Sequence, residues 1–373
     1  MPESELITAP EQATAGWLTA VLRRGGCLPR GRVTAVTRSG TEATSIWTLY
    51  HLQVAYSVDA RDPGGEGGGL PPHLLLKLSN SQRTSVHHGL GSGMEVWFYR
   101  HIASAPEMAR VPLARCYAAG HELPHGAAYA LVEDLSYTHW QPPLALPPFE
   151  PLCAQAIECL AALHAAWWGH GRLGPGGDVA EYLARVREAA GQAGLADPLE
   201  RLVPAFLDFL GDRLAPERRR LYEGALATWP ALQQHDSPRT LLHGDAHWWN
   251  FLYARDPAAD TTRIVDWGSW GIGAPMYDLA YAIALQWYPE RRRRLEARLV
   301  RRYHDALRRA GVAGYPWGAC WTEYRLAVAR GLFTPVRFWA VNVPAYIWWP
   351  MLERAVLAYE DLGCAGLSGA PAG

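Results

Sequence analysis

Three side chains with oxygen ligands lie close together in the chain, each a few residues after a short apolar run. Asp245 and Asn250 follow the apolar residues 241–242, and Asp266 follows residues 264–265. The pattern predicts two small strands that hold two carboxylates and one amide at a single loop mouth. Because no thiolate lies near them in sequence, these ligands suit Mg²⁺ better than zinc. Mg²⁺ keeps most of its water and is usually held by one or two side chains plus substrate phosphates, so this set is sufficient.

A second signal is the single lysine, Lys77, in a chain with 34 arginines. Its retention indicates a place that needs a compact ammonium, such as a tight phosphate contact that a planar guanidinium does not fit. Residues 73–79 alternate like a buried strand with Lys77 in the middle, where an unpaired charge would be costly. The candidate partner is Glu95, near the start of a helical pattern over residues 94–102. The alternative for Glu95 is a first-turn carboxylate that only complements the helix dipole.

Together these residue types match the needs of phosphoryl transfer. That reaction requires a base for the acceptor hydroxyl, metal ions that neutralise the triphosphate, and a lysine on the phosphates. The chain offers Asp245 as the base, Asn250 and Asp266 as metal ligands, and Lys77 paired with Glu95.

The elements that must position these residues change character along the chain. Before residue 136 the patterns predict strands around one helix, and after it helices dominate, with Pro-rich residues 142–151 marking the change. We therefore expect an α+β fold with an N-terminal lobe, residues 1–135, and a C-terminal lobe, residues 136–373. Residues 39–45 read as a small-residue hairpin that could cover phosphates, although they match neither phosphate-loop pattern. Residues 62–70 are glycine-rich and predict a flexible linker.

Composition excludes several classes of protein. The net charge is −1, so no global field recruits nucleic acid or an anionic membrane. Residues 290–310 carry nine arginines beside an apolar stripe, which predicts a helix with a solvated basic face. The six cysteines form no C-x-x-C pair, the N-terminus lacks a signal-peptide pattern, and no apolar run approaches membrane-spanning length. We expect a soluble cytoplasmic protein without nucleic-acid or membrane partners.

The same residues carry a resemblance to a known superfamily. Residues 243–250 match H-G-D-x-x-x-x-N, and residues 264–267 match an apolar pair followed by Asp-Trp. Residues 273–280 are similar to Gly/Asp-x-Pro-x-x-Asp-Leu-Ala, and Leu160–Ala165 to a Leu-Ala-x-Leu-His-Ala helix. With Lys77 and Glu95, this set resembles the aminoglycoside phosphotransferase and choline kinase superfamily, including its ecdysteroid-kinase-like branch. The resemblance covers roughly residues 30–330, with the motifs in the right order.

The resemblance implies a two-lobed protein-kinase-like fold, with an N-terminal antiparallel sheet and one main helix, and a larger, mainly helical C-terminal lobe. It implies ATP bound between the lobes, with its adenine on the backbone at about Val132–Leu135, which makes Glu133 and Leu135 nucleotide-binding positions. It also implies that Asp278 holds the catalytic loop. The chain departs from the family at Ala246-His247-Trp248-Trp249, which is bulkier than the common Leu-His-Pro-Gly.

Two other functions fit part of the pattern. A metal-dependent hydrolase could use His243, Asp245 and His247, but the H-E-x-x-H glutamate is missing and Lys77 would have no role. The second alternative is a catalytically inactive binding module of the same fold. It would not need the catalytic residues, yet every catalytic position is filled in this chain.

The acceptor is expected to be a small molecule with a hydroxyl group. From residue 136 onward the chain has 24 Arg against 24 Asp plus Glu, so no acidic excess favours a polycationic aminoglycoside. Ten of the 17 tryptophans lie at or beyond Trp248. Some of them could line a pocket for an apolar, aromatic or quaternary-ammonium substrate.

Overall fold

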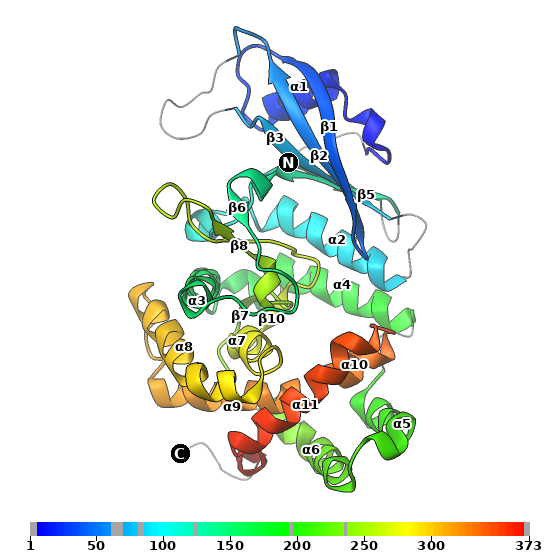
Figure 1. The fold of residues 1–373 in the computed structure, drawn as a ribbon, viewed down its shortest axis with the longest axis vertical. Helices are drawn as coiled ribbons and strands as arrows, with labels where there is room; N and C mark the ends of the chain where they lie inside the picture. The colour runs from blue at the N-terminus through cyan, green and yellow to red at the C-terminus, as the bar shows by residue number, and fades with distance from the viewer. Residues whose placement is uncertain are drawn as a thin grey trace. The chain divides into compact units, whose positions relative to one another are not determined.

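The chain forms two compact units in a computed structural model that describes residues 6–60, 70–80, 86–122, 126–193, 197–234 and 237–368 (Figure 1). The first unit comprises Met1–Gln141 and Leu252–Ser269, and the second comprises Pro142–Phe251 and Trp270–Gly373. The chain therefore passes from one unit to the other one residue after Asn250 and again three residues after Asp266.

The first unit is built on a five-stranded antiparallel sheet in the order β1-β2-β3-β5-β4. Its strands are β1 (Val33–Ala43), β2 (Trp47–Tyr56), β3 (His73–Ser79), β4 (Cys116–His121) and β5 (Ala128–Glu133). Helix α1 (Ala15–Arg24) packs on it through Leu18, Val21 and Leu22, which join the buried cluster that includes Leu74, Leu76 and Leu78 of β3. These leucines share one face of β3, as the alternation of the strand predicts, and leave Lys77 on the other face.

The longer helix of this unit is α2 (Val86–His101), which contacts β4 and β5. The sequence pattern predicted a helix from residue 94, so α2 begins eight residues earlier than expected. The early part contains glycines at 89, 91 and 93, which lower helix propensity and hide the pattern. Gly91 has a packing reason, since a Cβ there would lie 3.2 Å from Cδ1 of Ile46. Glu95 is consequently the tenth residue of α2 and not a first-turn carboxylate.

The predicted hairpin at residues 39–45 is also different in the structure. Strand β1 continues to Ala43, paired with Thr48 of β2, so the turn is confined to residues 44–46. Thr44 closes the turn by accepting from the backbone N–H of Trp47 through its Oγ1, at 2.9 Å. The side chain of Asn80, after β3, donates to the carbonyl oxygen of Thr44 at 2.9 Å. The predicted linker at residues 62–70 lies outside the described residues except for residue 70.

A small second sheet completes the first unit, with the strand order β6-β8-β9. It contains β6 (His139–Trp140), β8 (Phe251–Ala254) and β9 (Arg263–Ile264). Two short 3-10 helices, η2 (Pro106–Arg110) and η3 (Leu135–Tyr137), precede these strands in the chain. Ile264 of β9 donates from its backbone N–H to the carbonyl oxygen of Pro112 at 2.9 Å. This contact fixes the strand that leads to Asp266.

The second unit is mainly helical. Its longer helices are α3 (Glu150–Ala166), α4 (Asp178–Gln192), α5 (Leu199–Leu210), α6 (Pro216–Gln234), α7 (Met276–Ile283), α8 (Pro289–Arg309), α9 (Trp317–Gly331), α10 (Thr334–Ala340) and α11 (Ala345–Asp361). Two short antiparallel strands, β7 (Thr240–Leu242) and β10 (Gly271–Gly273), pair with each other. Helices α5 and α6 are separate because Gly211 takes a positive φ of 56° and ends α5.

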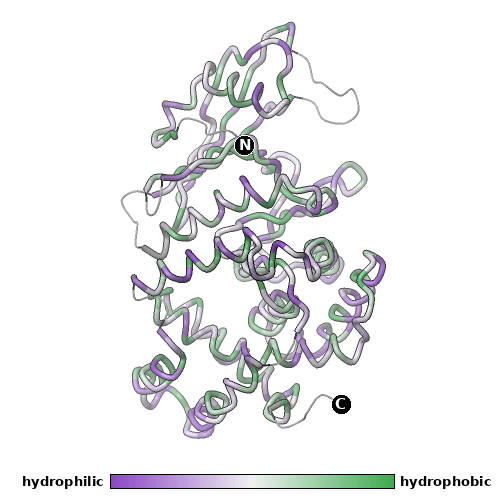
Figure 2. The backbone as a smooth tube through the Cα atoms, turned by 180° about the vertical axis from the view of Figure 1, so that it is seen from behind, coloured by the Kyte–Doolittle hydropathy of each residue, from purple (hydrophilic) through white to green (hydrophobic). Residues whose placement is uncertain are grey.

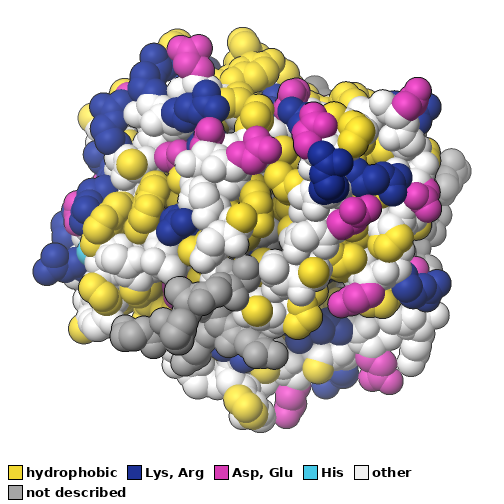
Figure 3. All heavy atoms as spheres, turned by 90° about the horizontal axis from the view of Figure 1, so that it is seen from below, with side chains coloured by type: hydrophobic (Ala, Val, Ile, Leu, Met, Phe, Trp, Pro, Cys, Tyr) yellow, Lys and Arg dark blue, Asp and Glu magenta, His cyan; other side chains and the backbone are white. Residues whose placement is uncertain are grey.

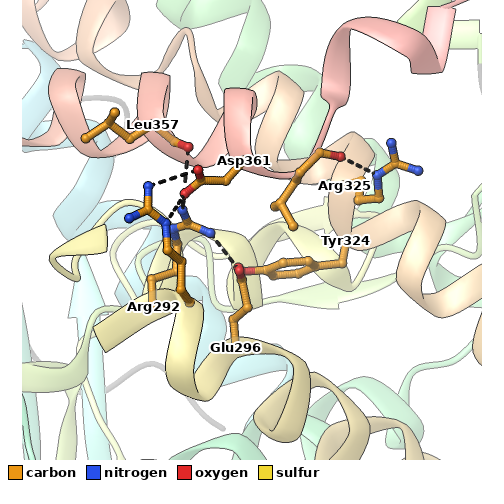
Figure 4. Close-up of polar contacts among 8 residues, drawn as sticks. Arg292, Glu296, Tyr324, Arg325, Leu357 and Asp361 are labelled. Atoms are coloured by element: carbon orange, nitrogen blue, oxygen red, sulfur yellow. Dashed lines mark hydrogen bonds and ion pairs between the residues drawn. The ribbon is translucent and has the colours of Figure 1, made fainter. Parts of the chain in front are cut away.

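Helix α8 contributes an exception to its predicted solvated basic face. The guanidinium of Arg292 is buried, and it donates to Oε1 of Glu296 at 2.6 Å and to Asp361 of α11 (Figure 4). Tyr324 of α9 donates from its hydroxyl to Oε2 of the same Glu296 at 3.2 Å. Arg292 therefore joins three helices from within the core, while seven other arginines of α8 are exposed.

The helices are amphipathic, and hydrophilic and hydrophobic residues alternate along most of them (Figure 2). On the face seen in Figure 3, basic and acidic side chains are interspersed, with apolar side chains between them. Among the helices of the described residues, none is long and apolar enough to cross a membrane.

The predicted α+β fold class is confirmed, with an antiparallel sheet and one main helix in the first unit and a larger, mainly helical second unit. The two units do not correspond to a simple division of the chain, because the segment Leu252–Ser269 belongs to the first unit although the residues on both sides of it belong to the second. The assignment of nucleotide binding to residues 1–135 and of catalysis to residues 136–373 stays a prediction.

Candidate active site

The loop that carries Asp245 begins at the end of β7 in the second unit. Leu241 and Leu242 are buried, and Thr240 donates from its Oγ1 to the carbonyl oxygen of His164 at 2.7 Å. At Gly244 the backbone has a φ of 82°, a conformation that side chains with a Cβ rarely adopt. The strand and the glycine together turn the chain so that Asp245 is the third residue after the end of the buried strand.

Asp278 of α7 holds this loop through its backbone. Its Oδ2 accepts the backbone N–H of His243 at 2.7 Å, and its Oδ1 accepts that of Gly244 at 2.9 Å. Asp278 has no exposed surface, and Nε2 of the buried His164 lies 3.1 Å from Oδ2. His164 is in turn held by the hydroxyl of Tyr303 at 2.7 Å from Nδ1. A buried carboxylate that accepts two backbone N–H groups keeps the loop in one conformation.

The carboxylate of Asp245 is 31% exposed and has two side-chain neighbours in the second unit. The hydroxyl of Tyr281, on α7, is hydrogen-bonded to it, and Nε2 of His247 lies 3.5 Å from its Oδ2. Burial raises the pKa of Tyr281 well above its usual value, and the negative charge of Asp245 raises it further. The phenol therefore stays protonated and donates to Asp245, which orients the carboxylate while part of it remains accessible.

Asn250 is tied to the same loop. Its Nδ2 donates to the carbonyl oxygen of Asp245 at 2.8 Å, and its backbone N–H donates to the carbonyl oxygen of His247 at 2.9 Å. Because the amide nitrogen is committed to the loop, the Oδ1 of this largely buried side chain is the atom that remains for a cation. An amide oxygen with this orientation fits the oxygen preference of Mg²⁺.

The bulky insert between Asp245 and Asn250 divides into core and surface. Trp248 is fully buried and stacks on Trp287, with ring centroids 4.9 Å apart. Trp249 is half-buried and donates from Nε1 to the carbonyl oxygen of Pro143 at 3.2 Å. Trp248 is thus a structural residue, which the sequence pattern did not distinguish from its neighbour.

In the first unit, Lys77 and Glu95 form the predicted pair. Nζ of Lys77 lies 2.5 Å from Oε1 of Glu95, and it lies 5.0 Å from the centre of the Trp47 ring. Glu95 has no exposed surface, while 9% of Lys77 is accessible. Burial raises the pKa of Glu95, the ammonium of Lys77 opposes this, and the charge of Asp266 adds to it. Asp266 is therefore an electrostatic neighbour of the pair.

Asp266 follows β9 with a φ of 68°, an uncommon conformation for a residue other than glycine. The next residue, Trp267, is fully buried and stacks on Phe98 of α2, with centroids 3.9 Å apart and planes at 6°. The same helix carries Glu95 three residues earlier. Packing of Trp267 thus holds the strained backbone of Asp266 against α2, the helix that carries Glu95, the partner of Lys77.

Glu133 and Leu135 stand at the end of β5. Glu133 pairs with Leu74 of β3, and its backbone N–H donates to the carbonyl oxygen of Arg115 at 2.8 Å. Leu135 is buried and begins η3. Between them, Asp134 caps η3 and its Oδ2 lies 2.7 Å from Nδ1 of His51 in β2, a contact that the sequence did not predict.

The structure thus places the predicted residues in two groups. The first unit brings together Lys77, Glu95 and Asp266, and the second brings together Asp245 and Asn250. Tyr281 is a functional candidate that sequence reasoning missed, because it lies 36 residues after Asp245 in an apolar helix pattern. His243, a ligand in the hydrolase hypothesis, is fully buried with its Nδ1 3.3 Å from the backbone N of Asp245, which gives it a role in the turn.

A sequence comparison decides the family. The model of the phosphotransferase enzyme family matches residues 72–315, which is more than half of the 373 residues. The chain belongs to this family. The match includes all the predicted site residues of this phosphotransferase, and the resemblance inferred from its motifs is confirmed. No curated protein matches the chain.

Solved structures similar to this phosphotransferase include choline kinase LicA from Streptococcus pneumoniae, at 11% identity over 88% of this chain and 94% of that chain, with a TM-score of 0.48. A choline/ethanolamine kinase family protein from Mesorhizobium loti is 14% identical over 90% and 89%, with a TM-score of 0.42. The GDP complex of aminoglycoside 2′-phosphotransferase-IIIa is 16% identical over 94% and 99%, with a TM-score of 0.46. At such identities these similarities do not identify an acceptor.

Proposed function

We propose that this phosphotransferase moves the γ-phosphate of ATP to a hydroxyl group of a small molecule. The observation that carries the proposal is the buried pair of Lys77 and Glu95, because the only lysine of the chain is held by a carboxylate within a sheet face. A lysine fixed in this way is suited to contact the phosphates of a nucleotide as a point charge.

In the proposed reaction the hydroxyl oxygen of the acceptor forms a bond to the γ-phosphorus while the bond from that phosphorus to the β,γ-bridging oxygen breaks. ADP leaves, and the hydroxyl proton passes to a carboxylate oxygen of Asp245, which later releases it to water. Tyr281 keeps the carboxylate in place for this transfer, and Asp278 keeps the loop in place.

Asn250 and Asp266 are the proposed ligands of Mg²⁺, which would neutralise charge on the phosphates. Each fits that role by its own geometry, through the amide oxygen left by the bond of Asn250 to Asp245 and through the carboxylate of Asp266 beside Glu95. Glu133 and Leu135 are proposed to contact the adenine through their backbone. In this proposal residues 1–135 bind the nucleotide, and residues 136–373 supply the base and the acceptor site.

Nucleotide turnover tests the proposal. The wild-type protein should consume ATP with an acceptor alcohol and form one phosphomonoester per ADP, as measured by coupled ADP release and mass spectrometry. Asp245→Asn should lower kcat by about 10³-fold or more while it retains ATP binding, because the amide cannot accept the proton. Full activity of Asp245→Asn would refute its role as base. ATP binding without turnover of any alcohol would instead favour the inactive binding module.

A further inference from the structure

A cavity of about 320 Å³ lies within the first unit, next to the end of α2. Its walls come from the last turn of α2, from residues 103–116 that follow this helix, and from β9. The volume falls at the lower end of the range of small-molecule sites. If each non-hydrogen atom takes about the 30 Å³ of a water molecule, the cavity suits a ligand of about ten such atoms. None of its lining residues has a role in the proposed transfer of phosphate.

Most of the wall of this cavity is apolar. Met108, Val111 and Leu113 are among the side chains that line it, and the first two are buried. Backbone hydrogen bonds hold this wall, because the N–H of Val111 donates to the carbonyl oxygen of Met108 at 2.9 Å. The N–H of Ile264 in β9 donates to the carbonyl oxygen of Pro112, also at 2.9 Å. A preformed apolar wall suits the hydrocarbon part of a ligand.

The charged side chains of the cavity are two arginines, Arg115 and Arg263. Among the described residues, no Asp or Glu lines the cavity. Burial raises the pKa of both Tyr99 and Cys116, so these two lining groups stay neutral. The lining therefore carries positive charge without an anionic side chain of its own, which favours an anionic ligand.

Both guanidinium groups have donors left for such an anion. Arg263 donates to the carbonyl oxygen of Leu113 at 3.2 Å and to Oδ1 of Asp260 at 2.6 Å. Its buried Nε has no acceptor in the described part of the chain. Arg115 is exposed, and its Nη2 lies 3.0 Å from Sγ of Cys27, a weak acceptor. Since a guanidinium offers five N–H donors in a planar fork, two of them can bind one carboxylate.

The cavity borders both segments of the first unit that carry predicted site residues. Tyr99 lies one turn after Glu95 on α2, and Arg263 on β9 lies three residues before Asp266. The residue after Asp266 stacks on α2, with ring centroids 3.9 Å apart. A ligand in the cavity would therefore contact α2 and β9 at once, and it would favour the arrangement in which the lysine–glutamate pair is formed.

We propose that this cavity binds a small organic carboxylate with an apolar chain or ring, and that its occupancy strengthens nucleotide binding. The carboxylate lies at the two arginines, and the apolar part lies against the wall of residues 103–114. The ligand stabilises the form of the first unit in which Glu95 lies beside Lys77, so it raises the affinity for ATP. The effect on ATP rests on the proposed function, whereas the binding of the carboxylate does not.

The probe for the cavity is sodium octanoate, with octanamide as its uncharged match of the same size. Isothermal titration calorimetry of the full-length wild-type protein without nucleotide should show one octanoate site with a Kd below about 1 mM. Octanamide should bind about tenfold more weakly, because it lacks the charge that the arginines bind. Arg115→Gln should weaken octanoate by about tenfold and leave octanamide unchanged.

Two further variants complete the binding test. Ala103→Phe fills the cavity and should remove the binding of both probes, with the melting temperature as the measure of folding. If Ala103→Phe does not fold, Arg115→Gln decides by itself. Arg110→Gln is the matched control, because Arg110 is an exposed arginine of the same segment that does not line the cavity. It should bind octanoate as the wild type does.

Titrations of ATP with and without saturating octanoate test the coupling. The Kd for ATP should fall by about fivefold with octanoate, and by linkage the Kd for octanoate should fall by the same factor with ATP. The site is overturned if octanoate and octanamide bind equally, if no single site appears below about 1 mM, or if Arg110→Gln weakens octanoate as much as Arg115→Gln does. A Kd for ATP that octanoate leaves unchanged overturns the coupling. A protein that binds octanoate but not ATP refutes the proposed function, and with it the coupling, while the carboxylate site stands.

Discussion

Nζ of Lys77 lies 2.5 Å from Oε1 of Glu95, a carboxylate without exposed surface in the middle of α2. This position removes the alternative that Glu95 serves only the helix dipole, since dipole effects are confined to the first and last turns. Taking both charges out of water is costly and is a poor source of stability, so the pair is better explained by a task that needs a fixed ammonium.

The first prediction is that Lys77→Arg lowers activity although it keeps the charge. The planar guanidinium is larger than the ammonium and cannot enter the space between Trp47 and Glu95 without displacing one of them. We expect kcat/KM for ATP to fall by about 10- to 100-fold, as measured by coupled ADP release. Arg38→Lys, at an exposed arginine of the same sheet, is the matched control and should keep full activity. An equally active Lys77→Arg protein would show that the single lysine has no special role.

The second prediction concerns the hydroxyl of Tyr281. Tyr281→Phe removes the donor that orients the carboxylate of Asp245 but keeps the buried ring. We expect kcat to fall by about tenfold or more, with little change in the KM for ATP. The base takes up the proton only in the transition state, so its misorientation slows the reaction without weakening the binding of ATP.

Its control is Tyr222→Phe. Tyr222 is also fully buried in the second unit, and its hydroxyl donates to the carbonyl oxygen of Leu332 at 3.0 Å. Both variants lose one buried hydrogen bond, so both should lose a similar free energy of unfolding, about 1 kcal/mol. If Tyr222→Phe lowered kcat as much as Tyr281→Phe does, the effect would be one of stability and not of positioning.

The residues that sequence reasoning found and missed differ in a physical way. The alternation of β3 separates Leu76 from Lys77, because strand periodicity is local and specifies which face is buried. The sequence order of Asp245 and Asn250 likewise predicts one loop. Tyr281 could not be found in this manner, since its neighbours on α7 are apolar and its contact with Asp245 depends on how the helix packs.

The burial of Arg292 was missed for the same reason. Nine arginines of one helix are nearly equivalent by periodicity, and the partner that sets Arg292 apart, Asp361, is 69 residues away. The start of α2 was missed because glycines suit close packing and weaken the local helical pattern. Contacts between segments that are far apart in the sequence decide the burial of Arg292 and the start of α2, and local patterns in a single sequence do not reveal these contacts.

The third prediction separates the structural carboxylate from the catalytic one. Asp278→Ala leaves the backbone N–H groups of His243 and Gly244 buried without their acceptor, which should cost about 2–5 kcal/mol of the free energy of unfolding. Urea unfolding of the second unit measures this loss, and activity should be lost with it. Asp245→Asn should abolish activity at unchanged stability, because its carboxylate is partly exposed. Equal free energies of unfolding for Asp278→Ala and Asp245→Asn, or an active Asp245→Asn protein, would contradict this division of roles.

The fourth prediction is a pH dependence of stability from the network of Arg292 and Asp361. Hydrogen bonds from Arg293 and the charge of Arg292 lower the pKa of Asp361 below its usual value of about 3.9. A carboxylate with a lowered pKa in the folded state stabilises the protein fully above its unfolded pKa, and this contribution is lost as the pH falls through the folded pKa. Asp361→Asn removes the charge that faces the buried Arg292, so it should lower the free energy of unfolding by about 1–3 kcal/mol at pH 7. The difference between wild type and variant should shrink below about pH 4, as measured by urea unfolding at several pH values.

Glu353→Gln on the same helix is the control, because Glu353 is mostly exposed and its cationic partner, Arg218, lies 3.5 Å away. A difference between Asp361→Asn and wild type that stays constant down to pH 3 would mean that the charge of Asp361 does not support Arg292.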